Sequence, residues 1–260
     1  MKTFHDERSD IAWTSCGDPS RPPLIMLHSL AMDREMWTSQ TIELFGADHH
    51  LVLCDLPGHG DSPLNGSSTM EAIADRIADL LGTIAAESFS VVGVSLGGCV
   101  AQALAIRHPG RVRALGLVDT TSAYHDPDAW SARARKAHNE GFPSLAGFQA
   151  SRWFTEGFRA RESQQITRLL GIFERTRIDD YEAICATMGQ FDATDQLSGI
   201  SCPTSVVVGV DDYATPIAHA RILAEKIPNA SLSVVDRASH LAILEQPRVV
   251  FDALAAVLQR

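Results

Sequence analysis

Short runs of consecutive apolar residues, each of β-strand length, recur along the chain between segments with apolar residues at helical spacing. Runs without polar alternation are typical of strands buried on both faces, as in a parallel sheet covered by helices. The pattern predicts a β-α-β organisation, with an earlier antiparallel edge strand over 11–15. The predicted inner strands cover residues 24–27, 51–54, 89–92, 114–118, 205–208 and 232–235.

Helix signals lie between several of these runs. Ser68 and Glu71 form a capping box, and the apolar stripe that follows continues to Ile84. Another helix is predicted from about 97 to 108, because the next two residues are proline and glycine. A final helix is predicted to begin near Pro247.

One connection between predicted strands is far longer than the roughly 2–6 residues usual in α/β units. Residues 121–198 are rich in Arg, Trp and Phe and have helical rather than strand-like spacing. We predict that 121–198 forms a helical cap, or lid, over the carboxyl edge of the sheet. It would be inserted into a core domain made of 1–120 and 199–260, where such caps shape substrate pockets.

Composition narrows the class of protein. The 260 residues are 45% hydrophobic, and no stretch approaches the roughly 18 apolar residues that a membrane span needs. The charged start lacks an apolar signal segment, and the five cysteines are scattered without a C-x-x-C pair. These features predict a cytoplasmic protein with reduced thiols. The formal charge of −10 disfavours nucleic acid as a partner.

Cofactor signals are missing from the sequence. It contains neither a phosphate-binding glycine loop nor a dinucleotide fingerprint. His59 lies near Asp55 and Asp61, but no strong metal-ligand spacing accompanies it, so a turn is the better interpretation. We therefore predict no cofactor, no metal, and a small molecule as the partner.

The segment Gly93-Val94-Ser95-Leu96-Gly97 carries the strongest chemical signal. This G-x-S-x-G pattern directly follows an apolar strand and opens a helix of small residues, which is the context of a nucleophile elbow. The glycines allow a sharp turn that leaves the serine in a strained conformation. Ser95 is therefore the predicted nucleophile.

A serine hydroxyl needs a base, and the base needs a partner that fixes its tautomer. His240 is the predicted base, because it lies in a loop after the last strand and before the final helix. Asp211 and Asp212 both follow the preceding strand, and Asp119 ends an earlier one. These three residues are the candidates for the acid.

An oxyanion hole requires two backbone N–H groups directed at the developing charge. Leu96, directly after the nucleophile, is the first predicted donor. Leu30, in the loop after the strand at 24–27, is the second. The neighbouring His28 is interpreted as a brace of this turn rather than as a catalytic group.

The predicted nucleophile, acid and base follow one another along the chain in the order Ser, Asp, His. In this order, and in its serine elbow, the chain resembles the α/β-hydrolase superfamily. The resemblance implies the α/β-hydrolase fold, a mostly parallel, eight-stranded type of sheet flanked by helices, with an inserted helical cap. It also selects Asp212, because related hydrolases carry G-x-x-D-x-x-x-P here with the acid in fourth place. The matching segment runs from Gly209 to Pro216.

Within that superfamily the chain looks most like the 3-oxoadipate enol-lactonases of aromatic-compound catabolism. It departs from them at His28, where asparagine is common, at Ala31, which replaces a glycine, and at Pro57, which replaces an arginine. The segments that carry the resemblance are His28-Ser29-Leu30 with Trp37, Asp119-Thr120-Thr121 with Trp130 and Arg133, and Arg152-Trp153-Phe154-Thr155 with Phe158.

This resemblance implies a serine esterase or lactonase that opens 3-oxoadipate enol-lactone through an acyl-enzyme. Arg133 and Arg152 would bind the substrate carboxylate, while Ser29, Trp130 and Trp153 would line the pocket. In the alternative interpretation, the tryptophans form the core of the cap and the arginines only cover its surface.

Other functions remain open at this point. The same triad serves carboxylesterases, other lactonases, C–C bond hydrolases and cofactor-free perhydrolases. A protein of another class, a hydrolase-fold binder without activity, is a further alternative. Dehalogenases and epoxide hydrolases are disfavoured, because they need a carboxylate where Ser95 stands. The sequence leaves the oligomeric state undetermined.

Overall fold

The computed structural model describes residues 2–84 and 86–259, and within them eight strands form a single sheet. The strands lie in the order β1-β2-β4-β3-β5-β6-β7-β8, and all pairs from β4 to β8 are parallel. The predicted, mostly parallel sheet is therefore confirmed. The strands are β1 (Lys2–Asp6), β2 (Ile11–Cys16), β3 (Pro23–Leu27), β4 (His50–Cys54), β5 (Phe89–Val94), β6 (Val112–Val118), β7 (Thr204–Gly209) and β8 (Ala230–Val235).

The edge of the sheet differs from the prediction. β2 pairs antiparallel with β4, as expected, but β1 covers its other side, with Phe4 opposite Trp13. β2 is therefore not the edge strand. β1 exposes most of its side chains, as edge strands do, so its sequence has no apolar run that would indicate a strand.

Helices cover both faces of this sheet. α2 packs against α3, and α3 and α9 both contact η2, which places these three helices on one face, whereas α1 and α11 contact each other on the opposite face. These elements are α1 (Ser39–Gly46), α2 (Met70–Thr83), α3 (Leu96–Arg107), α9 (Ile217–Lys226), α10 (Ala242–Glu245) and α11 (Pro247–Leu258), with the 3₁₀ turns η1 (Arg34–Met36) and η2 (Leu197–Gly199).

The start of α2 lies one residue later than the capping box predicts. Thr69 is the N-cap, because its Oγ1 accepts a hydrogen bond of 3.2 Å from the Ala72 N–H. Ser68 instead meets a helix from the long insert, where its carbonyl accepts a 2.7 Å bond from the Thr187 hydroxyl. Neighbouring Ser and Thr residues are both good caps, so tertiary contacts decided between them.

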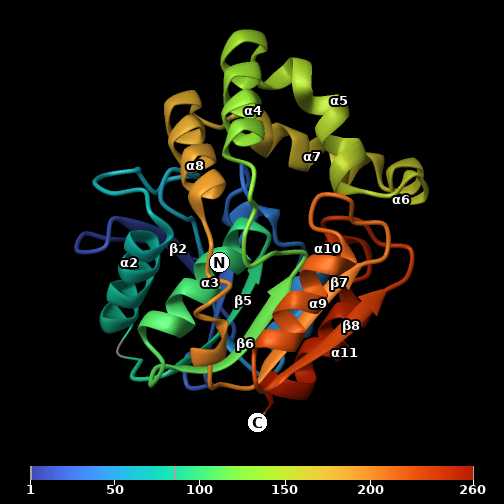
Figure 1. Ribbon diagram of the computed structural model, residues 1–260. Coiled ribbons are helices and arrows are strands. Elements are labelled where there is room, and N and C mark those ends of the chain that lie inside the picture. The colour runs from blue at the N-terminus through green and yellow to red at the C-terminus, as the bar shows by residue number, and fades with distance from the viewer. Residues whose placement is uncertain (1, 85, 260) are drawn as a thin grey trace.

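Five helices lie between β6 and β7 in the chain, and they gather beyond the end of the sheet at which β6 stops (Figure 1). We refer to α4–α8 as the upper helices. They are α4 (Pro127–Glu140), α5 (Phe142–Trp153), α6 (Glu156–Arg161), α7 (Ser163–Glu174) and α8 (Ile178–Gln190). That they form a separate cap domain stays a proposal.

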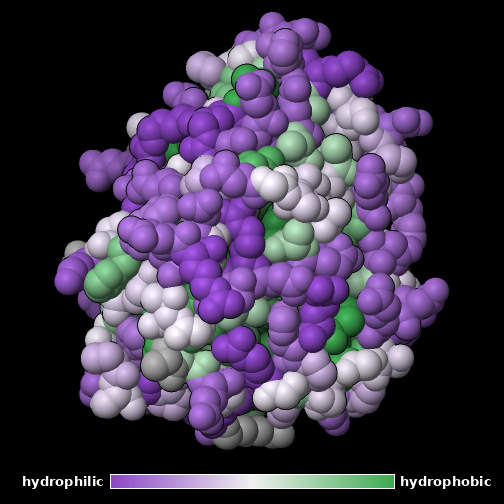
Figure 2. All heavy atoms as spheres, turned by 90° about the vertical axis from the view of Figure 1, so that its left-hand side faces the viewer, coloured by the Kyte–Doolittle hydropathy of each residue, from purple (hydrophilic) through white to green (hydrophobic). Residues whose placement is uncertain are grey.

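The side of the molecule that carries α2 and α8 is mostly hydrophilic, with small, separate hydrophobic areas (Figure 2). The apolar strands lie inside, and every residue of β4 and β5 is buried. Across residues 2–84 and 86–259, no helix combines the length and the hydropathy needed to cross a bilayer.

Candidate active site

The winding of the sheet reverses between β3 and β5. The chain first adds β4 on one side of β3, and it later adds β5 on the other side. In open α/β sheets the segments that leave such neighbouring strands diverge, and a crevice forms beyond their carboxyl ends. Leu30 follows β3 and Ser95 follows β5, so both lie at this crevice.

Ser95 occupies the turn between β5 and α3 with φ 54° and ψ −114°. A positive φ is unfavourable for a residue with a Cβ, so the surroundings must hold it there. Glycine is required on both sides. A Cβ at Gly93 would lie 2.1 Å from the Gly97 carbonyl oxygen, and one at Gly97 would lie 2.3 Å from the Leu27 carbonyl oxygen.

Replacing Gly97 with alanine is therefore expected to lower the free energy of unfolding by roughly 2–4 kcal/mol. The new methyl group would overlap the backbone of β3, which is paired on both sides. Urea unfolding followed by circular dichroism would measure the change. Gly171→Ala in α7 is the matched control, because its Cβ would meet nothing within 4 Å. Equal stability of the two variants would contradict this account.

Three side chains from different parts of the chain meet at the crevice. The Ser95 hydroxyl lies 3.0 Å from His240 Nε2, and His240 Nδ1 lies 3.0 Å from a carboxylate oxygen of Asp212. All three residues are buried. In this arrangement Nδ1–H donates to the carboxylate, which leaves Nε2 free to accept the serine proton.

The carboxylate of Asp212 is held by its own loop. It accepts hydrogen bonds of 2.8 Å from the Ala214 N–H, 3.0 Å from the Thr215 N–H and 2.7 Å from the Thr215 hydroxyl. Burial would raise the pKa of Asp212, but the charge and hydrogen bond of His240, with the Thr215 bonds, outweigh it and keep the pKa below its usual range. The acid is therefore ionised opposite the imidazole.

The other two acid candidates lie elsewhere. Asp211 is exposed, and its backbone rather than its side chain ties the loop, through a 3.0 Å bond to the Ala238 carbonyl. Asp119 is fully buried and accepts bonds from the Gly209 N–H at 2.9 Å and the Ala242 N–H at 2.8 Å. Asp119 therefore connects the loop that carries Asp212 to the loop that carries His240. Burial, and then repulsion from Asp212, raise the pKa of Asp119 well above its usual value.

The turn after β3 is locked to the serine elbow. The Gly97 N–H donates to the His28 carbonyl at 3.1 Å, and His28 Nδ1 donates to the Ser29 carbonyl at 2.8 Å. His28 Nε2 accepts from the Leu56 N–H at 2.9 Å, so both ring nitrogens are used within this turn. Leu30 lies in the same turn, and its role as an oxyanion donor, like that of Leu96, remains a prediction.

A narrow cavity of about 20 Å³ lies against Ser95 and His240, and it adjoins a larger cavity of about 490 Å³ among the upper helices. Six residues line both cavities, so the larger one leads toward the serine. The predicted substrate contacts all line the narrow cavity; they are Ser29, Trp130, Arg133, Arg152 and Trp153. Within 2–84 and 86–259, no group of three His, Cys, Asp or Glu side chains is arranged to hold a metal ion.

The two tryptophans differ in their surroundings. Trp153 is only 1% exposed, and its ring packs edge-on against Phe154 and Phe173, so it also belongs to the core of the upper helices. Trp130 is partly exposed and packs against Tyr124 and under the Arg133 guanidinium, 5.3 Å from the ring centre. Substrate contact by either tryptophan remains a prediction.

The two arginines are the main charges at the mouth of the narrow cavity. Arg133 donates to the Tyr181 hydroxyl at 2.6 Å and to the Gln149 side-chain oxygen at 3.3 Å. Within the described part of the chain, no carboxylate forms a salt bridge with Arg133 or Arg152. Burial lowers the pKa of Arg152, and the like charge of Arg133 lowers it further. The charge of Asp212 opposes this lowering of the pKa, but it does not form a salt bridge with Arg152.

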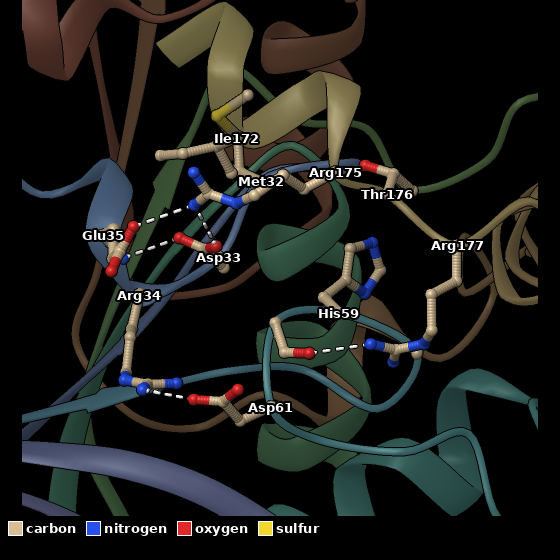
Figure 3. Close-up of a pocket in the computed structure, with 12 residues that line it drawn as sticks. Met32, Asp33, Arg34, Glu35, His59, Asp61, Ile172, Arg175, Thr176 and Arg177 are labelled. Carbon is tan, nitrogen blue, oxygen red and sulfur yellow. Dashed lines mark hydrogen bonds and ion pairs between the residues drawn. The ribbon is translucent and has the colours of Figure 1, made fainter. Parts of the chain in front are cut away.

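A different cavity, of about 390 Å³, lies where the upper helices meet the loops after β3 and β4 (Figure 3). Its arginines already have partners. Arg175 binds Glu35 at 2.9 Å, and Arg177 donates to the Gly60 carbonyl at 2.7 Å. Arg34 pairs with Asp61 at 2.6 Å. Arg175 and Arg177 therefore tie the segment between α7 and α8 to η1 and to the loop after β4, whereas the Arg34 pair joins η1 to that loop.

Sequence reasoning missed several residues of the site, among them Tyr124 and Gln149. Tyr124 and Gln149 line both the narrow and the larger cavity. Gln149 lies one turn before Trp153 on α5, so its helical spacing could have indicated a shared face. Tyr124 lies in an irregular segment between β6 and α4, where no periodicity predicts which way a side chain points.

Comparisons with known proteins agree with this geometry. A model of the alpha/beta hydrolase family matches residues 24–253. The chain is 30% identical to 3-oxoadipate enol-lactonase 2 of Acinetobacter baylyi, over 100% of this chain and 99% of that protein. It is 32% identical to the pimeloyl-[acyl-carrier protein] methyl ester esterase of Chromobacterium violaceum, over 92% of this chain and 94% of that protein.

Solved structures show the same architecture. An enol-lactonase from Burkholderia xenovorans superposes with a TM-score of 0.91 at 26% identity and covers 96% of each chain. A malate-bound thermophilic esterase from Thermogutta terrifontis has a TM-score of 0.87 at 29% identity, over 96% of this chain and 93% of that one. The fold, the family model and the full-length relatives agree, and this chain belongs to the alpha/beta hydrolase family.

Proposed function

We propose that this protein is a serine hydrolase that cleaves a small, carboxylate-bearing ester or lactone, with 3-oxoadipate enol-lactone as the leading substrate. The observation that carries the proposal is that Arg133 and Arg152 line the same narrow cavity as Ser95 and His240, and that neither arginine forms a salt bridge with a carboxylate of the described residues. The proposed product of the leading substrate is 3-oxoadipate.

In the proposed reaction, Ser95 Oγ attacks the lactone carbonyl carbon while its proton passes to His240 Nε2. The N–H groups of Leu30 and Leu96 would hold the resulting oxyanion, and Asp212 would stabilise the imidazolium. The ring C–O bond then breaks, and the enolate that leaves takes the proton from His240. Water, deprotonated by His240, hydrolyses the acyl-enzyme and releases the 3-oxo acid after tautomerisation.

The charges favour an anionic substrate over a neutral one. Two neighbouring guanidinium groups repel each other, and a carboxylate between them would remove this repulsion and accept charge-assisted hydrogen bonds. Two of the similar proteins support this direction, since one is named for the lactone of a dicarboxylic acid and another was solved with malate. The net charge of −10 makes such a local cationic site necessary for an anion.

Substrate assays would test this proposal. We expect ring opening of 3-oxoadipate enol-lactone, followed as loss of ultraviolet absorbance, and faster cleavage of monomethyl succinate than of dimethyl succinate. If the protein hydrolyses only p-nitrophenyl acetate and dimethyl succinate, the assignment as a serine esterase is kept and the proposal of an anionic substrate is refuted. The two methyl esters also test the alternative function of a methyl ester esterase, which the similarity to the Chromobacterium violaceum protein favours.

Arg152→Met is expected to lower kcat/KM for carboxylate-bearing substrates by roughly 10- to 100-fold, because one charge-assisted contact is lost. Hydrolysis of p-nitrophenyl acetate is expected to change by less than about threefold. Arg135→Met is the matched control, because Arg135 is exposed on α4 and lines neither cavity at the serine. An equal loss on charged and neutral substrates would count against carboxylate binding by Arg152.

A further inference from the structure

Glu245 is a buried carboxylate that the proposed reaction leaves without a role. It ends α10, the short helix that follows His240, and it is 7% exposed. Burial raises the pKa of Glu245, while hydrogen bonds from Thr155 and Ser239 oppose this change. A carboxylate is stable in the interior only where such bonds or a paired charge replace its lost water. The donors around Glu245 therefore show what this residue holds in place.

The donors to Glu245 come from two separate parts of the chain. Oε1 accepts a hydrogen bond of 2.7 Å from the Ser239 N–H, directly before His240. Oε2 accepts from the Thr155 hydroxyl at 2.6 Å, and the Thr155 N–H lies 3.1 Å from Oε2 and 3.3 Å from Oε1. Thr155 is the N-cap of α6, at its junction with α5. Glu245 thus bridges the loop of His240 to this junction.

A backbone hydrogen bond fixes the chain on the other side of His240. The Leu241 N–H donates to the Trp153 carbonyl at 3.1 Å. Trp153 ends α5 and Arg152 directly precedes it, and both line the narrow cavity at Ser95. The chain before and after the histidine is therefore tied to the end of α5 that carries one of the two arginines of the pocket.

We propose that Glu245 is a positioning residue that holds the loop of His240 and the end of α5 in one arrangement, so that the base and Arg152 are placed together. His240 Nε2 lies 3.0 Å from the Ser95 hydroxyl, and a displacement of about 1 Å between reacting groups can slow a reaction by roughly 100-fold. Glu245 acts through its bonds to the two segments rather than on the substrate. This inference rests on the proposed roles of His240 and Arg152.

The reactivity of Ser95 reports the position of His240 without recognition of a substrate carboxylate. Purified wild type, Glu245→Gln and Ser95→Ala are treated with a fluorophosphonate probe, and second-order labelling rates are compared. Glu245→Gln keeps the size of the side chain, but its NH₂ group cannot accept, so either Ser239 or Thr155 loses its acceptor. We expect Glu245→Gln to label roughly 10- to 100-fold more slowly than wild type. Ser95→Ala is expected to remain unlabelled.

Asp6→Asn is the matched control for the loss of a buried carboxylate. Asp6 is also 7% exposed, and it accepts hydrogen bonds from the Ser9 N–H at 2.7 Å and the Thr83 hydroxyl at 2.6 Å, but it lies on the edge strand β1. Both variants are expected to lose stability in urea unfolding, whereas only Glu245→Gln is expected to label slowly. Slow labelling of both variants, or wild-type labelling of Glu245→Gln, would overturn the proposal.

Thr155 tests the bridge from its other end, and it decides alone if Glu245→Gln does not fold. Thr155→Val removes the hydroxyl that donates to Glu245, whereas Thr155→Ser keeps it. We expect labelling roughly 3- to 10-fold slower in Thr155→Val and restored in Thr155→Ser. The effects of Thr155→Val and Glu245→Gln are not expected to add in the double variant, because both changes break the same contact. Additive effects, or equal rates in the valine and serine variants, would contradict the bridge.

Substrate preference tests the placement of Arg152. The ratio of kcat/KM for monomethyl succinate to that for dimethyl succinate is expected to fall by roughly 3- to 10-fold in Glu245→Gln. An unchanged ratio would overturn the joint placement of base and arginine. A wild type without this preference would refute the anionic substrate, while the labelling rates would still decide whether Glu245 places His240. A wild type that does not label at all would overturn both proposals.

Discussion

Replacing Ser95 with alanine is expected to lower kcat by roughly 10⁴- to 10⁶-fold, because no other group can form the acyl-enzyme. The methyl group of alanine fits the same turn, so the backbone and the cavities are expected to remain unchanged. The residual rate would come from an oxyanion hole and substrate binding alone. Hydrolysis of p-nitrophenyl acetate and of the enol-lactone would measure the loss.

The control for this variant is Ser201→Ala, an exposed serine just before β7. Its activity is expected to equal that of wild type, and both variants are expected to unfold at the wild-type urea concentration. A Ser95→Ala protein that still hydrolyses the ester at more than about a hundredth of the wild-type rate would rule out Ser95 as the nucleophile.

Replacing Asp212 with asparagine is expected to lower kcat by roughly 10³- to 10⁴-fold. The neutral amide cannot balance the charge that His240 acquires, and its NH₂ group favours the tautomer with hydrogen on Nε2, which cannot accept the serine proton. The low pKa of Asp212 in the folded protein has a further consequence. Its contribution to stability is present above the unfolded pKa of about 3.9 and is lost as the pH falls toward the folded value.

Asp211→Asn is the matched control, one residue away and exposed, and it is expected to retain activity within about threefold. Asp119→Asn tests the remaining candidate. Because Asp119 accepts two backbone hydrogen bonds, and Asp212 rather than Asp119 is hydrogen-bonded to His240, this variant is expected to lower the free energy of unfolding more than it lowers kcat. Activity that depends more on Asp119 or Asp211 than on Asp212 would contradict the assignment. Steady-state kinetics and urea unfolding of all three variants would decide which aspartate is the acid of the triad.

Much of this fold could be predicted because it depends on local rules. Apolar runs become buried strands, and the sharp strand-to-helix turn at Ser95 demands glycines on both sides, whatever surrounds it. The predictions failed where a strand is exposed, or where two neighbouring residues are equally good helix caps. β1 presents mostly exposed side chains, and Ser68 and Thr69 are both suitable helix caps, so no local pattern identified either feature.

The sequence by itself determined which residue types stand after which strands, and hence the candidates for nucleophile, base and acid. Only the tertiary structure decided which of them meet, since Ser95 and His240 lie 145 positions apart in the chain. It also turned Asp212 inward and Asp211 outward, through a tight turn in which the Asp212 N–H donates to the Gly209 carbonyl. The place of Tyr124 beside the cavity at Ser95 has no sequence signal, because it depends on how an irregular segment packs between the sheet and the upper helices.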